Sequence, residues 1–401
     1  KLLTNLYVAP GNAGTESIAQ NLVISISNFQ EIKATLLIKK ISLIIIGPEI
    51  PLIDGLTDFI KNDLELNEVL VVGPSKLGAM LEGSKDFSKE FMFKHNIPTA
   101  SYKTFNTNSL TEGLDYLETI QPPFVLKADG PAAGKGVLIL NDLVSAKTEL
   151  SNMLLKNKFG KSGDKVVIEG FLSGIELSCF VLLDGKSYLT LPSAKDYKRI
   201  GEGDTGLNTG GMGSISPVPF ASDEFLSKIE KKIIKPTVKG IIEDKLDYVG
   251  FLFIGIIKVE NEPFVIEYNV RMGDPETQVV LPRIKNDFLE MMIKTVLGEL
   301  DTIKLEVDNS TYANVVLVSG GYPETYENGK KITGLNKERD SIMFHAGTKR
   351  EDADIVTNGG RVLSIVSKSN DFKSALTKSY KSVEGIHFDK KNFRKDLGFD
   401  L

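Results

Sequence analysis

The segment Val265-Ile-Glu-Tyr-Asn-Val-Arg-Met-Gly-Asp-Pro-Glu276 decides much of the fold. From Ile266 to Met272, apolar and polar side chains alternate, which is typical of a β-strand with one buried face. Glu267, Asn269 and Arg271 share the other face of that strand. Polar side chains beside an apolar core are costly unless they have partners, so we favour a functional face over the exposed face of an edge strand.

The flanking sequence predicts antiparallel hairpins and helices. Short turns at Asn261-Glu262 and Asp184-Gly185 separate apolar runs, which indicates two hairpins. The runs that they join are Phe251–Glu260 with Pro263–Tyr268 and Val181–Leu183 with Tyr188–Leu191. Helices are expected over Ser222–Glu243, with a break near Pro236, and over Asp287–Leu297. The middle of the chain is therefore predicted to be α+β.

The first third of the chain has a different pattern. Apolar runs at Leu6–Ala9, Ile41–Ile46 and Val69–Val72 each end in a turn rich in Gly and Pro, and a helix is expected over Phe29–Lys40. This predicts an open α/β sheet with all three turns on one rim, where such sheets bind ligands. The first residues, Lys1-Leu-Leu-Thr-Asn5, read like the end of an element, so we expect a preceding strand to be missing from this sequence.

A third unit begins near Tyr312. It combines further strands, a turn at Asn358-Gly-Gly360 and a helix over Asp371–Ser382. These patterns favour a small β-rich unit at the end of the chain.

Composition narrows the class of protein. A length of 401 residues suggests two or three domains, and 48 basic against 53 acidic residues give a net charge of −5. This charge argues against nucleic-acid binding through bulk positive charge. One cysteine, Cys179, cannot form an internal disulfide, and no apolar run reaches the roughly 18 residues that a membrane helix needs. We therefore expect a cytoplasmic protein with neither nucleic-acid nor membrane partners.

Two further segments have the composition of nucleotide-binding sites. Lys127–Gly136 is a loop of small residues with two lysines, able to close over phosphates. It is not a Walker motif, because Gly136 and a strand follow Lys135. A flexible hairpin with solvated lysines is the alternative. Glu169 and Glu176 flank a short linker between two strands, where the backbone could read an adenine edge and a carboxylate could bind ribose. The alternative there is an ordinary connection.

A long polar loop follows at Asp196–Gly213. Long loops of this kind are usually functional or disordered. Its mixture of Asp, Lys and Arg could hold a zwitterionic substrate and a phosphate.

These segments, in this order, resemble the ATP-grasp superfamily and, within it, the phosphoribosylamine–glycine ligase (glycinamide ribonucleotide synthetase) family. The motifs that carry the resemblance span the chain: Pro10-Gly-Asn-Ala-Gly-Thr15, Gly47-Pro-Glu49, Leu81-Glu-Gly-Ser-Lys85, Ala132-Ala-Gly-Lys-Gly136, Asp196-Tyr-Lys-Arg199, Asn208-Thr-Gly-Gly-Met-Gly213, Gly273-Asp-Pro-Glu276, Phe344-His-Ala-Gly-Thr348, Asn358-Gly-Gly-Arg361 and Arg394-Lys-Asp396. Each motif is weak alone, whereas the ordered set is specific.

The resemblance implies a fold of mixed α/β and α+β class. A Rossmann-like N-terminal domain would occupy residues 1–80, with its first strand apparently missing. An ATP-grasp domain would occupy 81–305, with a mobile lid at about 100–190, and a small β-rich C-terminal domain 306–401.

The resemblance also implies a reaction. Glycine would react with ATP to give glycyl phosphate, which 5-phosphoribosylamine would convert to glycinamide ribonucleotide, ADP and phosphate, in purine biosynthesis. The implied cofactor is Mg²⁺ or Mn²⁺, and the implied partners are the small-molecule substrates, for a monomer or weak oligomer. The alternatives are another ATP-grasp carboxylate–amine ligase, a biotin-dependent carboxylase component and a nucleotide-binding module without catalysis.

Residue roles follow from the resemblance as expectations. Arg271 would be catalytic, stabilising the acyl phosphate, and Glu267 and Asn269 would bind the metal. ATP would be held by Lys85, Lys127, Gly134, Lys135, Gly136, Glu169, Phe171 and Glu176. The other substrates would be held by Gly11, Asn12, Gly14, Thr15, Glu49, Asp196, Lys198, Arg199, Asn208, Thr209, Gly210 and Gly273.

The chain also departs from the family pattern. The strand and Gly-Gly-Arg-Glu-His loop with which the family usually opens do not precede Lys1, which would impair phosphoribosylamine binding if they are truly absent. Tyr197 stands where many members have His, so no role for an imidazole follows there. Pro131 and Met272 replace Leu and Phe, and Pro131 is expected to stiffen the lid hinge.

Overall fold

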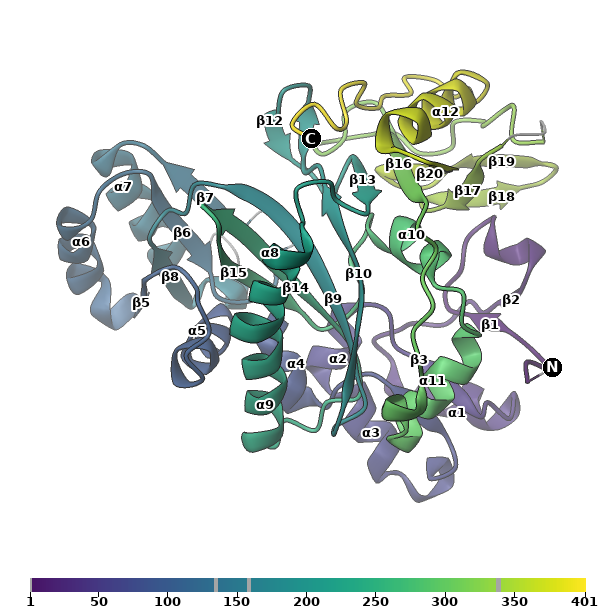
Figure 1. The fold of residues 1–401 in the computed structure, drawn as a ribbon, viewed down its shortest axis with the longest axis horizontal. Helices are drawn as coiled ribbons and strands as arrows, with labels where there is room; N and C mark the ends of the chain where they lie inside the picture. Colours follow the sequence, from purple (N-terminus) through teal and green to yellow (C-terminus); the bar gives the residue numbers. More distant parts are fainter. Residues whose placement is uncertain (1, 133–135, 157–159, 337–339) are drawn as a thin grey trace.

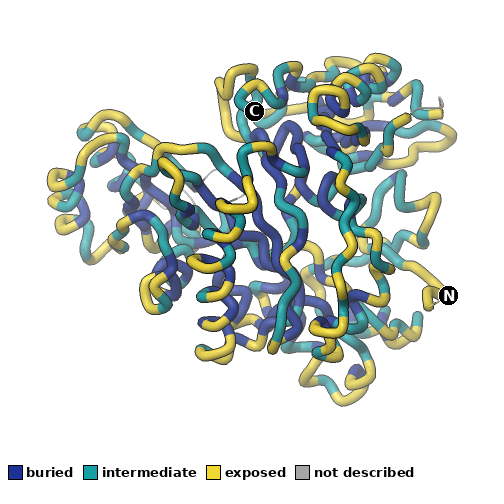
Figure 2. The backbone as a smooth tube through the Cα atoms, in the orientation of Figure 1, coloured by how far each residue is buried: buried dark blue, intermediate teal, exposed yellow. Residues whose placement is uncertain are grey.

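The computed structural model describes residues 2–132, 136–156, 160–336 and 340–401. Figure 1 shows the N-terminal elements below a central sheet, a separate lobe built on β5–β8, and the C-terminal elements above. The most deeply buried backbone follows the strands of the central sheet (Figure 2).

The N-terminal part contains a short parallel sheet of two strands, β3 and β4, surrounded by helices. Its elements are β1 (Tyr7–Val8), β2 (Gln20–Asn21), α1 (Phe29–Ile38), β3 (Leu43–Ile45), α2 (Glu49–Asp54), α3 (Leu56–Asn62), β4 (Leu70–Val72), α4 (Lys76–Gly83) and α5 (Lys85–Lys94). Side-chain caps begin several of these helices: Asn28 caps α1, Ser75 caps α4 and Ser84 caps α5.

One expectation for this region was wrong. We predicted that Leu6–Ala9 joins the sheet of the other two early strands, but β1 pairs in parallel with β2 in a separate two-stranded sheet. The amide of Gln20 donates to the carbonyl of Leu6 at 2.9 Å, and that of Leu22 to Val8 at 2.8 Å. A polar segment nearby thus satisfies the backbone of β1, and the apolar pattern gave no sign of that partner.

The second lobe is a four-stranded sheet of order β5-β8-β6-β7, in which every pairing is antiparallel. Its elements are β5 (Tyr102–Asn106), α6 (Leu110–Thr119), β6 (Phe124–Ala128), β7 (Val137–Leu140), α7 (Leu143–Leu155) and β8 (Lys165–Glu169). The helices α6 and α7 and the sheet share one apolar core that includes Leu117, Leu126 and Leu150. This lobe therefore has a core of its own.

The central sheet has eight strands in the order β15-β14-β9-β10-β13-β16-β20-β17. They are β9 (Ile175–Leu183), β10 (Tyr188–Asp196), β13 (Gly213–Ser216), β14 (Gly250–Val259), β15 (Glu262–Asn269), β16 (Thr311–Val318), β17 (Ile342–His345) and β20 (Arg361–Ser369). Both hairpins predicted from the sequence are present as β9–β10 and β14–β15, although the second turn is Glu260-Asn261, one residue earlier than expected. The sheet runs without interruption from the middle of the chain into its C-terminal part.

Helices pack around this sheet, and two small ribbons extend from it. The remaining elements are β11 (Arg199–Gly201), β12 (Thr205–Asn208), α8 (Asp223–Ile229), α9 (Lys235–Glu243), α10 (Thr277–Val280), α11 (Phe288–Leu297), β18 (Thr348–Glu351), β19 (Asp354–Thr357) and α12 (Phe372–Glu384). The break expected near Pro236 is a π-helical turn, Glu230–Ile234, between α8 and α9. Widening the helix one turn before the proline accommodates a residue that cannot donate a backbone hydrogen bond. Across the described ranges, no helix is both long and apolar enough to span a membrane.

Candidate active site

A cavity of about 720 Å³ opens where the N-terminal helices, the second lobe and the central sheet meet. Most of the residues singled out from the sequence line it, although they come from positions throughout the chain. They are Glu49, Lys85, Lys127, Glu169, Phe171, Glu176, Asp196, Lys198, Arg199, Asn208, Thr209, Gly210, Glu267, Asn269, Arg271 and Gly273. A large cleft with charged groups converging on it is the place to look for binding and chemistry.

The end of β15 presents the polar face predicted from the alternating pattern. The register between β14 and β15 shifts at Ile266, which has no partner between the pairs Gly255↔Glu267 and Ile256↔Val265. Such a bulge re-aims the residues beside it. The carbonyl of Ile266 accepts a hydrogen bond from Lys127 Nζ at 3.5 Å, which ties the strand to the second lobe.

Arg271 is held by carboxylates from two other elements. Its Nε donates to Glu49 Oε2 at 3.0 Å, and its Nη2 donates to Glu82 Oε1 at 2.9 Å. Nη2 also lies 3.4 Å from Asn269 Oδ1. Burial raises the pKa of Glu82 to about 7, against the opposing effects of Arg271 and of the hydrogen bond from the Val270 amide. The guanidinium is thereby fixed in the cavity wall near the end of β15.

Glu169 lies between two lysines. Its Oε2 is 3.1 Å from Lys89 Nζ and 3.0 Å from Lys127 Nζ. All three side chains are nearly inaccessible to solvent, and Oε1 of Glu169 has no hydrogen-bond partner. Burial lowers the pKa of Lys89 to about 8, and Glu169 opposes that effect. A buried, half-satisfied carboxylate of this kind fits a ligand that supplies a donor.

Lys85 is placed at the first turn of α5. Its ammonium lies 3.4 Å from the carbonyl of Asp129 and 3.3 Å from that of Gly130, beside the loop that follows β6. Burial lowers the pKa of Lys85. Gly136, at the far end of the same loop, accepts from the Ala128 amide and is outside the cavity lining. The expected roles of Gly134 and Lys135 lie outside the described residues.

A second cluster of charges lines the same cavity. Lys198 Nζ is 2.6 Å from Glu176 Oε2, and Lys198 lowers the pKa of that carboxyl. Burial raises the pKa of Asp196, and burial together with Asp196 raises that of Glu276 to about 8. Glu276 Oε1 accepts a hydrogen bond from Ser178 Oγ at 3.0 Å. Two acids with raised pKa values, Asp196 and Glu276, thus lie near Lys198, whose ammonium is paired with Glu176.

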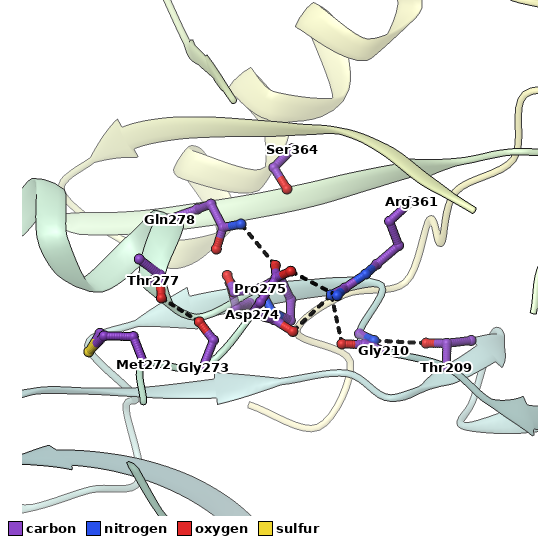
Figure 3. A network of polar contacts seen from close by, with 12 residues as sticks. Thr209, Gly210, Met272, Gly273, Asp274, Pro275, Thr277, Gln278, Arg361 and Ser364 are labelled. Atoms are coloured by element: carbon purple, nitrogen blue, oxygen red, sulfur yellow. Dashed lines mark hydrogen bonds and ion pairs between the residues drawn. The ribbon is translucent and has the colours of Figure 1, made fainter. Parts of the chain in front are cut away.

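Arg361 joins the two loops that carry Gly210 and Asp274, both of which line the cavity. Figure 3 shows its guanidinium reaching from β20 toward Gly210 and Asp274. Nη1 donates to the carbonyls of Gly210 at 2.7 Å and of Asp274 at 2.8 Å, and Nη2 donates to Asp274 Oδ2 at 2.8 Å. The C-terminal part of the chain therefore helps to shape the cavity wall.

The loop Gly11–Thr15 lies elsewhere. Gly11, Asn12, Gly14 and Thr15 are outside the cavity lining. Asn12 Oδ1 accepts from the amides of Gly14 and Thr15, and its Nδ2 donates to the carbonyl of His345 at 2.7 Å. This Asx turn packs against the end of β17, so its expected role toward substrate stays a prediction.

Several lining residues were not predicted. They are Glu82, Lys89, Lys195, Asp274 and Glu276. Lys89 is four positions after Lys85 on α5, so helical spacing could have found it. Glu82, Asp274 and Glu276 belong to motifs recognised in the sequence, but no role was predicted for these three side chains. Lys195 gave no signal, since it reads as one polar residue in a strand.

The donor set at β15 suits a divalent cation held together with phosphates. Glu267 and Asn269 line the cavity from one strand face and offer a carboxylate and an amide oxygen. Within the described ranges, no cluster of three His, Cys, Asp or Glu side chains could hold a metal alone. Two oxygen donors that need substrate oxygens to complete the shell are the arrangement that Mg²⁺ favours.

Family models match almost the whole chain in three consecutive parts. The phosphoribosylglycinamide synthetase N domain matches residues 1–82, the ATP-grasp (A) domain of the same enzyme matches 83–277, and its C domain matches 312–400. All three descriptions name one enzyme.

Individual relatives agree with the family models. The chain is 42% identical to the phosphoribosylamine–glycine ligase of Caldanaerobacter subterraneus over 98% of this chain and 93% of that protein. It is 42% identical to a bifunctional purine biosynthetic protein of Pichia angusta, covering 98% of this chain but only 50% of that longer protein.

Solved structures share the fold. The phosphoribosylamine–glycine ligase of Thermotoga maritima superposes with a TM-score of 0.82 at 34% identity, over 98% of this chain and 93% of that one. A biotin carboxylase of Campylobacter jejuni superposes with a TM-score of 0.72 at 15% identity, over 92% and 80% of the two chains. The second likeness concerns the fold alone.

Proposed function

The chain belongs to the phosphoribosylglycinamide synthetase family, and from this premise we propose how its residues perform the reaction. It is an ATP-dependent ligase of purine biosynthesis that joins glycine to 5-phosphoribosylamine through glycyl phosphate. The observation that carries this function is the ordered match of all three family models along one chain.

ATP binds between the second lobe and the central sheet in this proposal. Lys85 and Lys127 lie at the cavity wall as positive charges for the phosphates. Adenine suits the place beside Glu169 and the linker with Phe171. The exocyclic amino group of adenine can donate to Glu169 Oε1, which has no other hydrogen-bond partner among the described residues. Glu176 is suited to the ribose hydroxyls. We retain Gly134, Lys135 and Gly136 as part of the phosphate loop on the sequence alone.

Enzymes of the ATP-grasp superfamily generally use a divalent cation with ATP. Glu267 and Asn269 would hold it, and we propose Mg²⁺ or Mn²⁺. When bound, the cation neutralises charge on the triphosphate.

Phosphoryl transfer depends on positioning and charge neutralisation more than on a side-chain nucleophile. A carboxylate oxygen of glycine attacks the γ-phosphorus of ATP, the bond to the β-phosphate oxygen breaks, and ADP leaves. Arg271, locked by Glu49 and Glu82, is in place to stabilise the charge that spreads over the transferred group. Because its partners already fix its geometry, little reorganisation is needed at the moment of transfer.

The second step uses the cluster around Asp196, Lys198 and Glu276. The amine of 5-phosphoribosylamine attacks the acyl carbon of glycyl phosphate, a C–N bond forms, and phosphate leaves with the original glycine oxygen. The acid pair Asp196 and Glu276 is suited to hold the ammonium of glycine. Lys198 and Arg199 are suited to bind anionic groups of the substrates. The wall of the cavity around them includes Asn208, Thr209, Gly210 and Gly273. Gly11, Asn12, Gly14, Thr15 and Glu49 stay proposed for the phosphoribosyl group.

Other expectations stay proposals. We propose domain boundaries near residues 80 and 305, a mobile lid at about 100–190, a cytoplasmic location and a monomer or weak oligomer. The second lobe has an antiparallel sheet and an apolar core of its own, which supports the proposal of a lid. A body with its own core can move as a unit.

The test is ADP release by the purified chain with ATP, Mg²⁺, glycine and 5-phosphoribosylamine. We expect continuous ADP release over many turnovers only when all four are present. Release that ignores glycine, or none with the complete mixture, would contradict the proposal.

The alternative is another carboxylate–amine ligation on the same fold. A panel of amino acids and amines in the same assay separates the two. The proposal fails if another acid–amine pair is used at least as efficiently as glycine with 5-phosphoribosylamine.

A further inference from the structure

The hairpin of β11 and β12, here called the ribbon (Arg199–Asn208), is held in place by contacts with residues outside the hairpin. Its two strands form a sheet of their own, and all four residues of β12 are exposed. A two-stranded hairpin is marginally stable in water by itself. Yet Arg199, Asp204 and Asn208 of the ribbon line the cavity. Its position over the substrates must therefore come from other contacts.

Arg394 supplies the strongest of these contacts. It is fully buried, and its Nη1 donates to Asp204 Oδ1 at 2.5 Å and to the carbonyl of Arg199 at 3.3 Å. Nε and Nη2 donate to the two oxygens of Asp396 at 2.8 and 2.7 Å. A fork of this kind fixes geometry as well as charge.

The turn of the ribbon depends on the same contacts. Asp204 has φ +54°, a left-handed conformation that costs free energy outside glycine, although Asp and Asn tolerate it best. The amide of Gly203 donates to Asp396 Oδ2 at 2.6 Å. The turn is thus fastened at two adjacent residues by the Arg394–Asp396 pair.

The end of the chain is fastened as well. Asp400 accepts a hydrogen bond from Tyr197 Oη at 3.0 Å and lies 3.1 Å from Lys195 Nζ. The guanidinium of Arg394 lies 5.4 Å from the centre of the Tyr197 ring. Figure 1 shows the C-terminus beside β12. The segment Arg394–Asp400 therefore links the ribbon to β10 and its extension.

We propose that the segment Arg394–Asp400 is a positioning element of the substrate site and that Arg394 is its central residue. This rests on the proposed function, because the ribbon carries residues assigned there to the substrates. Arg394 and Asp396 are outside the cavity lining, whereas Asp204 and Asp400 are part of it. Arg394 thus acts through the ribbon and sets the affinity for glycine or 5-phosphoribosylamine, whereas, among the described residues, Lys85 and Lys127, proposed for the phosphates of ATP, make no contact with the ribbon or with Arg394 that would tie ATP binding to it.

The first test compares lysine substitutions at two buried arginines. R394K keeps the positive charge but loses the forked hydrogen bonds of the guanidinium. R283K is the matched change at a buried arginine that contacts Ser216 and Asp308 and lies outside the cavity lining. We expect R394K to raise the KM for glycine or 5-phosphoribosylamine about tenfold and the KM for ATP less than about twofold. R283K should lower thermal stability without that selective change. Equal changes in all KM values, or the same pattern in both variants, would overturn the proposal.

A second test uses the exposed side of the contact. D204N removes one charge and keeps a residue that tolerates the left-handed backbone, and E202Q is the matched change on the same turn, at an exposed side chain. D204N should reproduce the KM pattern of R394K, the double variant should add little to either, and E202Q should behave as wild type. Full additivity would mean that Asp204 acts independently of Arg394 and would contradict the proposal.

Hydrogen exchange separates this inference from the ligase activity. Amides of residues 199–208 should exchange at least about tenfold faster in R394K than in wild type, and not in R283K. Unchanged exchange there would overturn the positioning role even in an active enzyme. A wild-type chain without ligase activity would contradict the proposed function and leave this exchange result valid.

Discussion

Arg271 and Glu49 are 222 positions apart in the chain, and Nε of the arginine donates to Oε2 of the glutamate at 3.0 Å. The contact joins the first turn of α2 to a residue two positions beyond the end of β15. It aligns the N-terminal helices with the strand that carries Glu267 and Asn269. The catalytic geometry thus depends on how two parts of the chain meet.

The first prediction concerns the guanidinium of Arg271. R271K keeps the charge but cannot contact Glu49 and Glu82 at once, so kcat should fall about 100-fold with a small change in the KM for ATP. Steady-state ADP release measures both. R350K, at an exposed arginine paired with Glu16, is the control and should keep wild-type kcat. A kcat within about twofold of wild type in R271K would remove Arg271 from the chemistry.

The second prediction concerns the metal. E267Q should raise the Mg²⁺ concentration needed for half-maximal activity about 10- to 100-fold, because an amide replaces a charged ligand. E262Q is the matched change on the same strand, at a residue that pairs with Lys228 and Lys232. Its metal requirement should equal that of wild type. Identical Mg²⁺ titrations of the two variants would mean that Glu267 is not a ligand.

The sequence predicted those parts of the site that a single strand or loop determines. The alternation that begins at Ile266 predicted that Glu267 and Asn269 share a face of β15, although the strand ends at Asn269 and Arg271 lies beyond it. Contacts between distant segments, such as Arg394 with Asp204, left no local pattern. The break near Pro236 was predicted from the proline, although its form as a π-helical turn over Glu230–Ile234 was not.

The third prediction concerns the buried charges around Glu169, which lie between α5 and the second lobe. E169Q leaves Lys89 and Lys127 buried without a counter-charge, so the free energy of unfolding should fall by about 3–5 kcal/mol. The KM for ATP should rise as well. E118Q breaks an exposed pair with Lys147 in the same lobe and should cost less than about 1 kcal/mol. Denaturant unfolding of both variants checks this, and equal losses would contradict the assigned difference in burial.

The fourth prediction concerns pH. Burial and Asp196 raise the pKa of Glu276 to about 8, so the carboxyl is mainly neutral at pH 7 and ionises as the pH rises. The ionised form attracts the ammonium of glycine, and the KM for glycine should therefore fall between about pH 6.5 and 8.5. The KM for ATP over the same range is the internal control. E276Q should abolish the trend. A KM for glycine that rises with pH, or an unchanged trend in E276Q, would rule out this role.

The most direct test follows one oxygen atom. Glycine labelled with ¹⁸O in both carboxylate positions is converted with ATP and 5-phosphoribosylamine, and the released phosphate is analysed by mass spectrometry. If the carboxylate attacks the γ-phosphorus in the cavity beside Arg271, each phosphate carries one ¹⁸O from glycine and the amide product keeps the other. Unlabelled phosphate, with both labels retained in the product, would contradict an acyl phosphate intermediate.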